Sequence, residues 1–271
     1  EKTAMEAALG MSYCGKRALT VMKHVGLNVA SDVLMNMSVS GINGGLVIVV
    51  ADDPSMHSSQ NEQDSRFYGR FARIPILEPA HQEEAYTMMH YAFDLSEELQ
   101  LPVLVRMVTR LSHSRTGIEF RERRAQNGIQ LPVNTDRFAL VPMNARKQYK
   151  KLVRKKKSLL KASERSRFNK LELSADKKLG VIACGIGLNY VLENIGENLE
   201  FYSLLKISQY PIPRKKIKKI YDHCEEVLVV EEGFPMVEEL LKDFLDRDKK
   251  IRGKLSGDLP PVGELDPNIV A

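Results

Sequence analysis

Short apolar runs alternate with longer segments of helical periodicity along most of the chain. In the first half, the runs rich in Val, Ile and Leu predict buried strands, and the segments between them have the composition of helices. The predicted strands cover 18–22, 46–50, 74–77 and 103–108. The predicted helices cover 3–13, 29–37 and 82–99. Strands that alternate with helices in this way are typical of parallel sheets with crossover helices.

The same alternation returns in the second half, after an interruption at 112–171. Strands are predicted at 179–183, 201–207 and 227–230, and helices at 188–194, 215–223 and 236–245. The interruption contains Pro132, Pro142 and many charged residues, so we place a domain boundary inside it. The pattern therefore predicts an α/β fold with two three-layer domains built on mainly parallel sheets.

Length and composition agree with two globular domains. The chain has 271 residues, of which 43% are hydrophobic and 28% charged, and a typical domain has about 150 residues. The longest apolar run, 45–51, is far shorter than the ~20 residues needed to cross a bilayer. Three scattered cysteines, Cys14, Cys184 and Cys224, form no C-x-x-C pair. We expect no membrane span, no secretion signal and a cytoplasmic location.

One segment carries the basic character of the chain. Residues 146–170 contain 12 Lys or Arg and the single acid Glu164, a local charge of +11, so the remaining residues carry −6 of the total of +5. Such a cluster can bind nucleic-acid phosphates or an acidic partner. Few aromatic residues accompany it, and we interpret it as a solvated helical face or linker. Nucleic acid is not an expected partner.

Polar segments follow the predicted strands of the first half. Ligands of open α/β sheets bind beyond the carboxyl ends of the strands. We expect loops after these strands at 23–28, 52–64 and 112–115, and these loops contain three of the six histidines: His24, His57 and His113. Each histidine alone is as well explained by a hydrogen-bonding role at the surface. Their shared position makes these segments the candidate site.

Other familiar motifs are missing or incomplete. The chain contains no G-x-x-x-x-G-K-[ST] loop, no G-x-S-x-G elbow and no H-E-x-x-H pair. Gly185-Ile186-Gly187 lacks the third glycine of a dinucleotide fingerprint, so we interpret it as a tight strand-to-helix turn. Glu231-Glu232-Gly233 follows a predicted strand, and we expect these carboxylates to cap the next helix or to accept backbone hydrogen bonds.

The first helix places small residues Ala4, Ala8 and Gly10 after Glu1, which predicts a side that another surface can approach closely. With the segments 1–4 (EKTA), 22–30 (MKHVGLNVA), 49–54 (VVADDP) and 56–64 (MHSSQNEQD), this pattern resembles the pyrimidine-binding domain of thiamine diphosphate enzymes. Among these enzymes, it is similar to the alpha subunits of indolepyruvate ferredoxin oxidoreductases.

The second half supports the same resemblance. Lys206-Ile207, Tyr210-Pro211, the segment 229–233 (VVEEG) and 263–265 (GEL) resemble the transketolase C-terminal-like domain that follows the pyrimidine domain in these enzymes. The resemblance covers nearly the whole chain and is weakest in the basic segment. It implies a pyrimidine-binding domain at 1–120, a basic linker at 121–171 and a transketolase C-terminal-like domain at 172–271.

The resemblance also implies a reaction and residue roles. In the family, a thiamine diphosphate enzyme oxidatively decarboxylates an aryl 2-oxoacid, coenzyme A accepts the acyl group, and electrons pass through iron–sulfur clusters to ferredoxin. A glutamate at the first helix exchanges a proton with the aminopyrimidine ring, and Glu1 has this position. His24 and His57 are candidate catalytic residues that donate a proton or orient the substrate carboxylate. The implied cofactor contacts are Glu1, Lys23, His24, Val25, Gly26, Leu27 and Asn28. The implied substrate-side residues are His57, Ser58, Ser59 and Asn61.

The sequence departs from the family in what it lacks. It contains no Gly-Asp-Gly motif for Mg²⁺ and diphosphate and no cysteine run for [4Fe-4S] clusters, so we expect the chain alone to hold no metal or cofactor. We therefore interpret it as an internal fragment or one part of a divided enzyme, inactive alone. The expected partners are the missing diphosphate-binding and ferredoxin-like domains, a beta subunit, ferredoxin and coenzyme A, in a dimer or heterotetramer.

Two alternatives remain open at this stage. An enzyme of the same family could act on an aliphatic 2-oxoacid, because one sequence does not identify the residues that select the side chain. A non-catalytic interaction or scaffold protein could retain the α/β shell and use the basic segment for acidic partners or nucleic acid.

Overall fold

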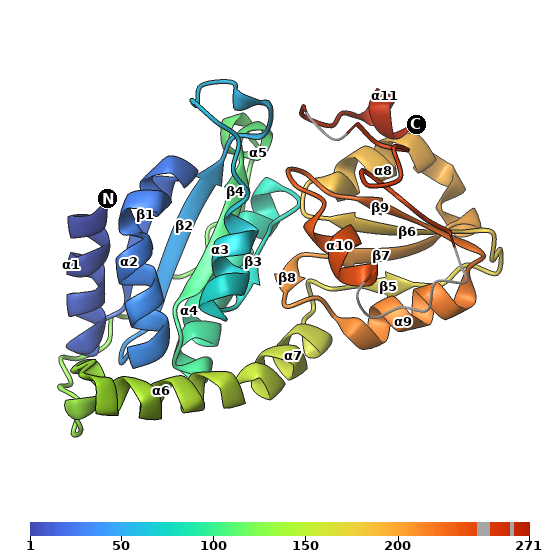
Figure 1. Cartoon of the computed structure of the whole chain (residues 1–271). Coiled ribbons are helices and arrows are strands. Elements are labelled where there is room, and N and C mark those ends of the chain that lie inside the picture. Colours follow the sequence, from blue (N-terminus) through green and yellow to red (C-terminus); the bar gives the residue numbers. More distant parts are fainter. Residues whose placement is uncertain (243–249, 261–262) are drawn as a thin grey trace. The chain divides into compact units, whose positions relative to one another are not determined.

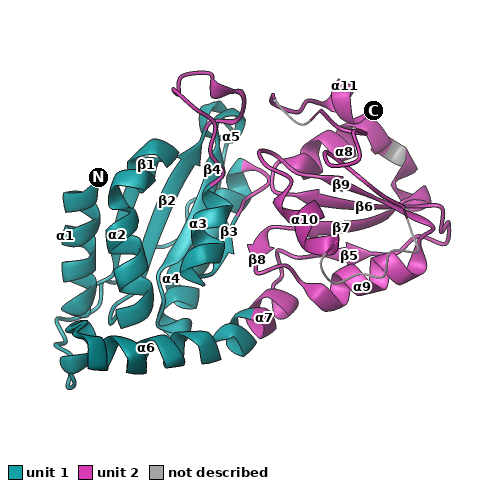
Figure 2. Ribbon diagram, viewed as in Figure 1, with its two compact units in different colours: residues 1–52, 65–77, 82–159 teal, residues 53–64, 78–81, 160–271 magenta. Residues whose placement is uncertain are grey.

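The computed structural model describes residues 1–242, 250–260 and 263–271. The chain divides into two compact units (Figure 2). Unit 1 comprises residues 1–52, 65–77 and 82–159, and unit 2 comprises residues 53–64, 78–81 and 160–271. Both units are α/β, as the alternation of strand and helix patterns predicted. Two short segments that follow strands of unit 1 therefore belong to unit 2.

The sheet of unit 1 is parallel, with strand order β1-β2-β4-β3. Its strands are β1 (Ala18–Lys23), β2 (Leu46–Asp52), β3 (Ile76–Leu77) and β4 (Val103–Val108). The central strands β2 and β4 are buried almost throughout, which explains their near-continuous apolar sequences. In β1, alternate residues are buried, and Leu19 and Val21 on its other face are exposed.

Helices cover both faces of this sheet. The right-handed crossover rule places α2 (His24–Ser40) and α3 (Ser65–Ala72) on one face and α4 (Gln82–Leu99) on the other, and Figure 1 shows α4 behind the strands. Helix α1 (Lys2–Tyr13) packs beside α2 and against β1. The short α5 (Thr109–His113), the 3-10 helix η2 (Asp136–Phe138) and α6 (Pro142–Arg154) complete the unit. Helix α7 (Lys156–Arg165) continues into unit 2.

A buried ion pair joins the carboxyl ends of the two central strands. Arg106 Nε of β4 lies 2.6 Å from Asp52 Oδ2 of β2, and neither side chain is exposed to solvent. The same oxygen accepts hydrogen bonds from the backbone N–H and the hydroxyl of Ser65, at the start of α3. The pair therefore ties β2, β4 and α3 together beneath the carboxyl edge of the sheet.

Unit 2 has a second sheet, with strand order β10-β9-β6-β7-β5. All neighbours are parallel except β5 and β7. Its strands are β5 (Leu171–Glu172), β6 (Leu179–Cys184), β7 (Ser203–Ile207), β9 (Glu226–Val230) and β10 (Lys250–Arg252). The helices of the unit are η1 (Pro54–Met56), α8 (Gly187–Ile195), η3 (Gly196–Phe201), α9 (Arg214–His223), α10 (Met236–Lys242) and α11 (Pro267–Val270). The short strand β8 (Gln209–Tyr210) follows β7 in the chain.

Two turns in unit 2 confirm the sequence interpretation. Gly185, with φ of +49°, turns the chain from β6 into α8, and a Cβ at this position would lie 2.5 Å from Cγ of the buried Glu78. Glu231 accepts hydrogen bonds from the backbone N–H groups of Val237 and Glu238, so it caps α10. The neighbouring Glu232 accepts a hydrogen bond from the buried Tyr190 hydroxyl.

Element boundaries differ from the prediction in several places. The strands predicted at 74–77 and 201–207 begin two residues later, at Ile76 and Ser203, and the helix predicted at 29–37 begins at His24. Helix α10 is described to Lys242, and the last residues of the helix predicted at 236–245 lie outside the described residues. The basic segment forms α6 and α7, whose cations are mostly exposed, as expected of a helical face.

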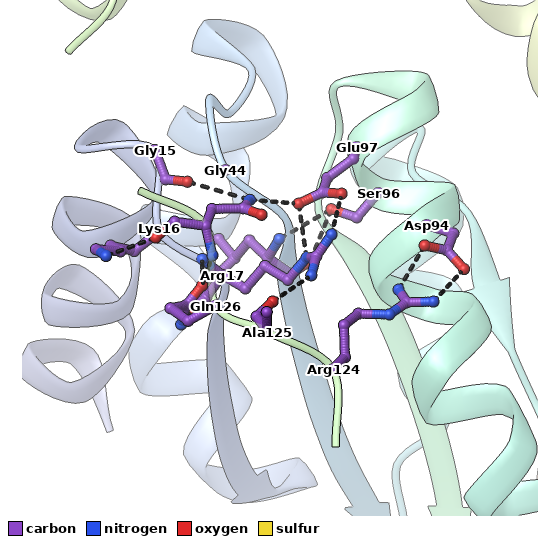
Figure 3. A network of polar contacts seen from close by, with 12 residues as sticks. Gly15, Lys16, Arg17, Gly44, Asp94, Ser96, Glu97, Arg124, Ala125 and Gln126 are labelled. Atoms are coloured by element: carbon purple, nitrogen blue, oxygen red, sulfur yellow. Dashed lines mark hydrogen bonds and ion pairs between the residues drawn. The ribbon is translucent and has the colours of Figure 1, made fainter. Parts of the chain in front are cut away.

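Part of the predicted linker is bonded to unit 1. Figure 3 shows Gln126 bonded twice to the backbone of Arg17, whose guanidinium donates to both carboxylate oxygens of Glu97. This contact lowers the pKa of Glu97 below its ordinary value. Arg124 likewise donates to both oxygens of Asp94 on α4. Polar side chains thus hold residues 124–127, a segment without regular secondary structure, against β1 and α4.

In the described ranges, no helix combines the length and the apolar composition that a membrane crossing requires.

Candidate functional site

The candidate site lies where strands of unit 1 end. Lys23 is the last residue of β1, and His24 begins α2 immediately after it. The expectation of a loop at 23–28 is therefore wrong: residues 24–28 form the first turn of a helix. The helix begins early because His24 and Leu27 are buried against the unit, and tertiary packing of these side chains compensates for the lack of a side-chain cap at Lys23.

Glu1 and Gly26 are brought into close approach. A Cβ built on Gly26 would lie 2.5 Å from Cγ and 3.1 Å from Oε1 of Glu1. The Glu1 side chain therefore occupies the space that any other residue at position 26 would fill. Within the described part of the chain, the Glu1 carboxylate has no hydrogen-bond or ion-pair partner, and the residue is exposed. An available carboxylate thus rests on the first turn of α2.

The small residues that follow Glu1 do not form a packed stripe. Met5, Ala8 and Ser12 are the buried residues of α1, whereas Ala4 and Gly10 are exposed. Nothing lies within 4 Å of a Cβ built on Gly10. Within unit 1, the buried face of α1 follows the i, i+3, i+7 positions that start at Met5, so the side expected for close approach by another surface stays a prediction.

The other residues at 23–28 divide between core and surface. The side chains of His24 and Leu27 are buried, Val25 is half-buried, and Lys23 and Asn28 are exposed. Asn28 Oδ1 accepts a hydrogen bond of 2.5 Å from the Tyr68 hydroxyl of α3. Lys23, Glu1 and Asn28 are therefore the side chains of this group that solvent reaches most readily.

The second group of candidate residues belongs to unit 2 and is organised by Asp53. The buried Asp53 carboxylate accepts hydrogen bonds from the backbone N–H groups of His57 and Ser58 and from the Ser59 hydroxyl. Ser55 and Met56 adopt left-handed backbone conformations in the same turn. Asp53 lies in the 49–54 motif, but the sequence predicts no role for it, because spacing alone does not reveal which carboxylate accepts the hydrogen bonds of a turn.

His57 has a partner from a distant part of unit 2. Its Nε2 lies 3.1 Å from Glu264 Oε2, and half of the His57 side chain is exposed. Asn61 is exposed and accepts a hydrogen bond from Gln63. The sequence marks Glu264 only as part of the 263–265 motif, and no signal in it pairs positions 207 residues apart.

Sequence comparison identifies the family of this chain. Residues 1–164 match the family described as pyruvate flavodoxin/ferredoxin oxidoreductase, thiamine diphosphate-binding. The chain belongs to this family. Indolepyruvate oxidoreductase subunit IorA of Methanothermobacter marburgensis is 41% identical over 100% of the chain and 45% of its own length. The same subunit of Pyrococcus abyssi is 41% identical over 96% of the chain. The chain therefore spans less than half the length of these relatives.

Solved structures with this fold agree with the family. A 2-oxoglutarate:ferredoxin oxidoreductase from Magnetococcus marinus matches 99% of the chain and 54% of its own, with a TM-score of 0.73 and 15% identity. A split gene transketolase matches 92% of the chain, with a TM-score of 0.57 and 15% identity. At this identity they support the fold alone, which is the two-sheet α/β fold expected of thiamine diphosphate-binding chains.

The described side chains form no cluster with the composition of a metal site. In residues 1–242, 250–260 and 263–271, no three His, Cys, Asp or Glu side chains are grouped as metal ligands.

The contact between Glu1 and Gly26 allows a test that separates the position of the Glu1 side chain from the stability of the chain. Gly26→Ala should displace the Glu1 side chain. If Glu1 has the catalytic role that the sequence predicts, turnover of the complete enzyme should fall by about 10²-fold, the loss typical of a misplaced catalytic group. The stability of the chain should not fall, because Ala favours a helix over Gly by roughly 0.5–1 kcal/mol. Steady-state kinetics and urea unfolding measure the two effects.

Gly10→Ala is the matched control for this variant, because Gly10 is also helical but has open space around it. It should stabilise the chain by a similar amount, roughly 0.5–1 kcal/mol, and leave turnover unchanged. Equal turnover in the two variants would show that the Glu1 position does not depend on Gly26.

Proposed function

We propose that this chain is the pyrimidine-side part of an enzyme that oxidatively decarboxylates aryl 2-oxoacids of the indolepyruvate type. In the complete enzyme, coenzyme A accepts the acyl group and ferredoxin accepts the electrons. The chain alone is inactive. The observation that carries the proposal is the exposed Glu1 carboxylate on Gly26 in a thiamine diphosphate-binding family member. The names of the relatives support the choice of an indole side chain.

The residues around Glu1 fit the aminopyrimidine ring of thiamine diphosphate. A carboxylate with no other partner can accept a hydrogen bond from a ring nitrogen or return the proton to it. Gly26 keeps the surface beside it free of side-chain atoms. The bound cofactor supplies a carbon nucleophile for the ketone of the substrate. In the proposed site, Glu1 holds and moves the proton, and Lys23, His24, Val25, Gly26, Leu27 and Asn28 form the surface that orients the ring.

The loop organised by Asp53 is proposed to face the substrate. His57, Ser58, Ser59 and Asn61 offer hydrogen-bond donors and acceptors for a 2-oxoacid carboxylate, and Asp53 fixes the turn that carries three of them. His57 or His24 donates a proton or orients the carboxylate, a contribution worth ~10²- to 10⁴-fold where a proton is transferred.

The rest of the complete enzyme is also part of the proposal. We assign 1–120 to the pyrimidine-binding domain, 121–171 to a basic linker and 172–271 to the transketolase C-terminal-like domain. A diphosphate-binding domain with Mg²⁺, a ferredoxin-like domain with [4Fe-4S] clusters and a beta subunit complete a cytoplasmic dimer or heterotetramer. The share of the relatives that this chain leaves uncovered supports the presence of further domains or subunits.

The experiment that tests the proposal compares substrates in the native enzyme. The complete enzyme, purified with its partners, is assayed for ferredoxin reduction with coenzyme A and indolepyruvate, phenylpyruvate, pyruvate or 2-oxoglutarate. We expect the two aryl acids to give the highest kcat/KM and the 271-residue chain alone to give no turnover. A preference for pyruvate or 2-oxoglutarate would replace the aryl substrate by an aliphatic one. No thiamine diphosphate and no turnover with any 2-oxoacid would favour a non-catalytic interaction protein.

A further inference from the structure

One nitrogen of the His57 ring is held by a carboxylate from a distant part of unit 2. His57 Nε2 lies 3.1 Å from Glu264 Oε2, and the Glu264 side chain is only 15% exposed. An ionised carboxylate only accepts hydrogen bonds, so Nε2 carries a proton in this contact. Among the described residues, no group forms a hydrogen bond with Nδ1, and half of the His57 side chain is exposed. Nδ1 is therefore the ring nitrogen that remains available for a ligand.

The backbone of His57 is fixed independently of its ring. The His57 N–H donates to Asp53 Oδ1 at 3.2 Å, and the Ser55 N–H donates to Glu62 Oε2 at 2.9 Å. Ser55 and Met56 have φ angles of 67° and 56°, which residues other than glycine rarely adopt. Hydrogen bonds to two carboxylates thus hold a turn that the chain would otherwise disfavour. As a result, His57 is constrained at its backbone as well as at its ring.

The segment that carries Glu264 does not depend on His57 for its position. The next residue, Leu265, is fully buried, and α11 packs against α8. Asn194 Nδ2 of α8 also donates a hydrogen bond to the backbone oxygen of Pro267. A contact between His57 and Glu264 is therefore not needed to hold this segment. An anchored carboxylate beside a histidine ring is the arrangement by which proteins orient the ring and fix its tautomer.

The available nitrogen of His57 has the chemistry to bind a carboxylate. The oxygens of a 2-oxoacid only accept hydrogen bonds, so a ring nitrogen that binds them must donate. Nδ1 donates when His57 is protonated, and Nε2–H then still donates to Glu264. We infer that Glu264 is a positioning residue, which fixes the ring of His57 and leaves Nδ1–H to donate to the carboxylate of the 2-oxoacid. This inference rests on the proposed function, in which His57 faces the substrate.

Inhibition of the complete enzyme by two ligands that differ in the carboxylate tests the inference. Indolelactate has the carboxylate of the proposed aryl substrate, and indole-3-ethanol lacks it. We expect Glu264→Ala to raise the inhibition constant of indolelactate and the KM of indolepyruvate by roughly ten-fold or more, the effect of one hydrogen bond to a charged group. The inhibition constant of indole-3-ethanol should change less than about two-fold. Glu264→Gln keeps an oxygen that can accept from Nε2–H, so it should recover most of the loss.

Two further variants separate positioning from a structural role. In a His57→Asn background, Glu264→Ala should weaken indolelactate no further, because a residue that acts only through His57 then has nothing to position. Asn194→Ala removes a hydrogen bond that holds the Glu264 segment but leaves the His57 contact in place. It should leave both inhibition constants unchanged. If the enzyme prefers an aliphatic 2-oxoacid, its own 2-hydroxyacid and alcohol replace the two indole ligands.

Three results would overturn the inference. They are equal weakening of both inhibitors by Glu264→Ala, additive losses in the double variant, and an effect of Asn194→Ala as large as that of Glu264→Ala. Turnover of indolepyruvate with unchanged constants in Glu264→Ala would refute the role of Glu264 and leave the proposed function standing. Absence of turnover with any 2-oxoacid in the wild type would refute the proposed function and the inference with it.

Discussion

Glu1→Gln in the complete enzyme is expected to lower turnover by about 10²- to 10⁴-fold while the chain folds normally. Gln keeps the length and shape of the side chain over Gly26, so the close contact between the two residues remains. It loses the ability to take a proton, and the expected loss is the usual contribution of a positioned acid or base. The measurement is kcat for the proposed aryl 2-oxoacid substrate at saturating thiamine diphosphate, with circular dichroism to confirm the fold.

Glu6→Gln is the matched control for this prediction. Glu6 is an exposed carboxylate of α1 and lies one turn beyond the helix start, away from Gly26. Its replacement changes the charge of α1 by the same amount and should leave kcat unchanged. If Glu1→Gln retained wild-type turnover, the assignment of Glu1 as the proton-transfer group would be wrong, and the cofactor surface would have to be sought elsewhere in the family fold.

The elements of the sheet cores were predictable because their sequences repeat a simple pattern. β4 and α4 have the predicted bounds. β2 begins where predicted and ends slightly later, at Asp52. Burial on both faces requires continuous apolar sequence, which is hard to mistake. The short strands β5, β8 and β10 were not predicted, because two or three residues carry no periodicity.

The start of α2 could not be predicted from local signals. Residues 23–28 contain no capping Ser, Thr, Asp or Asn before the first turn, and Gly26 disfavours a helix. The turn forms because His24 and Leu27 pack into the unit. Gly26 is needed there for a reason outside its own segment, namely the space taken by Glu1.

The sequence predicts candidate site residues but not their contacts. Motifs point to Glu1, His24 and His57, and their roles stay a prediction, whereas the hydrogen bonds of Asp53 and Glu264 and the Glu1 contact with Gly26 are seen only in the fold. The hydrogen bonds of Arg137 and Lys155 to the ends of α2 and α4 could not be predicted either, because a run of charged residues does not show which cations are buried.

Arg106→Met is expected to lower the free energy of unfolding by about 3–5 kcal/mol. The substitution removes the guanidinium from the fully buried Asp52 carboxylate, and removing one partner of a buried ion pair has a cost of this size. Ser65 still donates two hydrogen bonds to Asp52, but these do not replace the lost positive charge. Urea unfolding of the 271-residue chain measures the change.

Arg124→Met is the control, because Arg124 also contacts a carboxylate through two hydrogen bonds but does so at the surface. Exposed ion pairs contribute roughly 0–1 kcal/mol, so this variant should unfold close to the wild type. The double variant Asp52→Asn with Arg106→Met removes both charges and should recover part of the stability lost in Arg106→Met. A loss below about 1 kcal/mol in Arg106→Met would mean that solvent reaches Asp52, and the ion pair would then not be what joins β2, β4 and α3 beneath the candidate site.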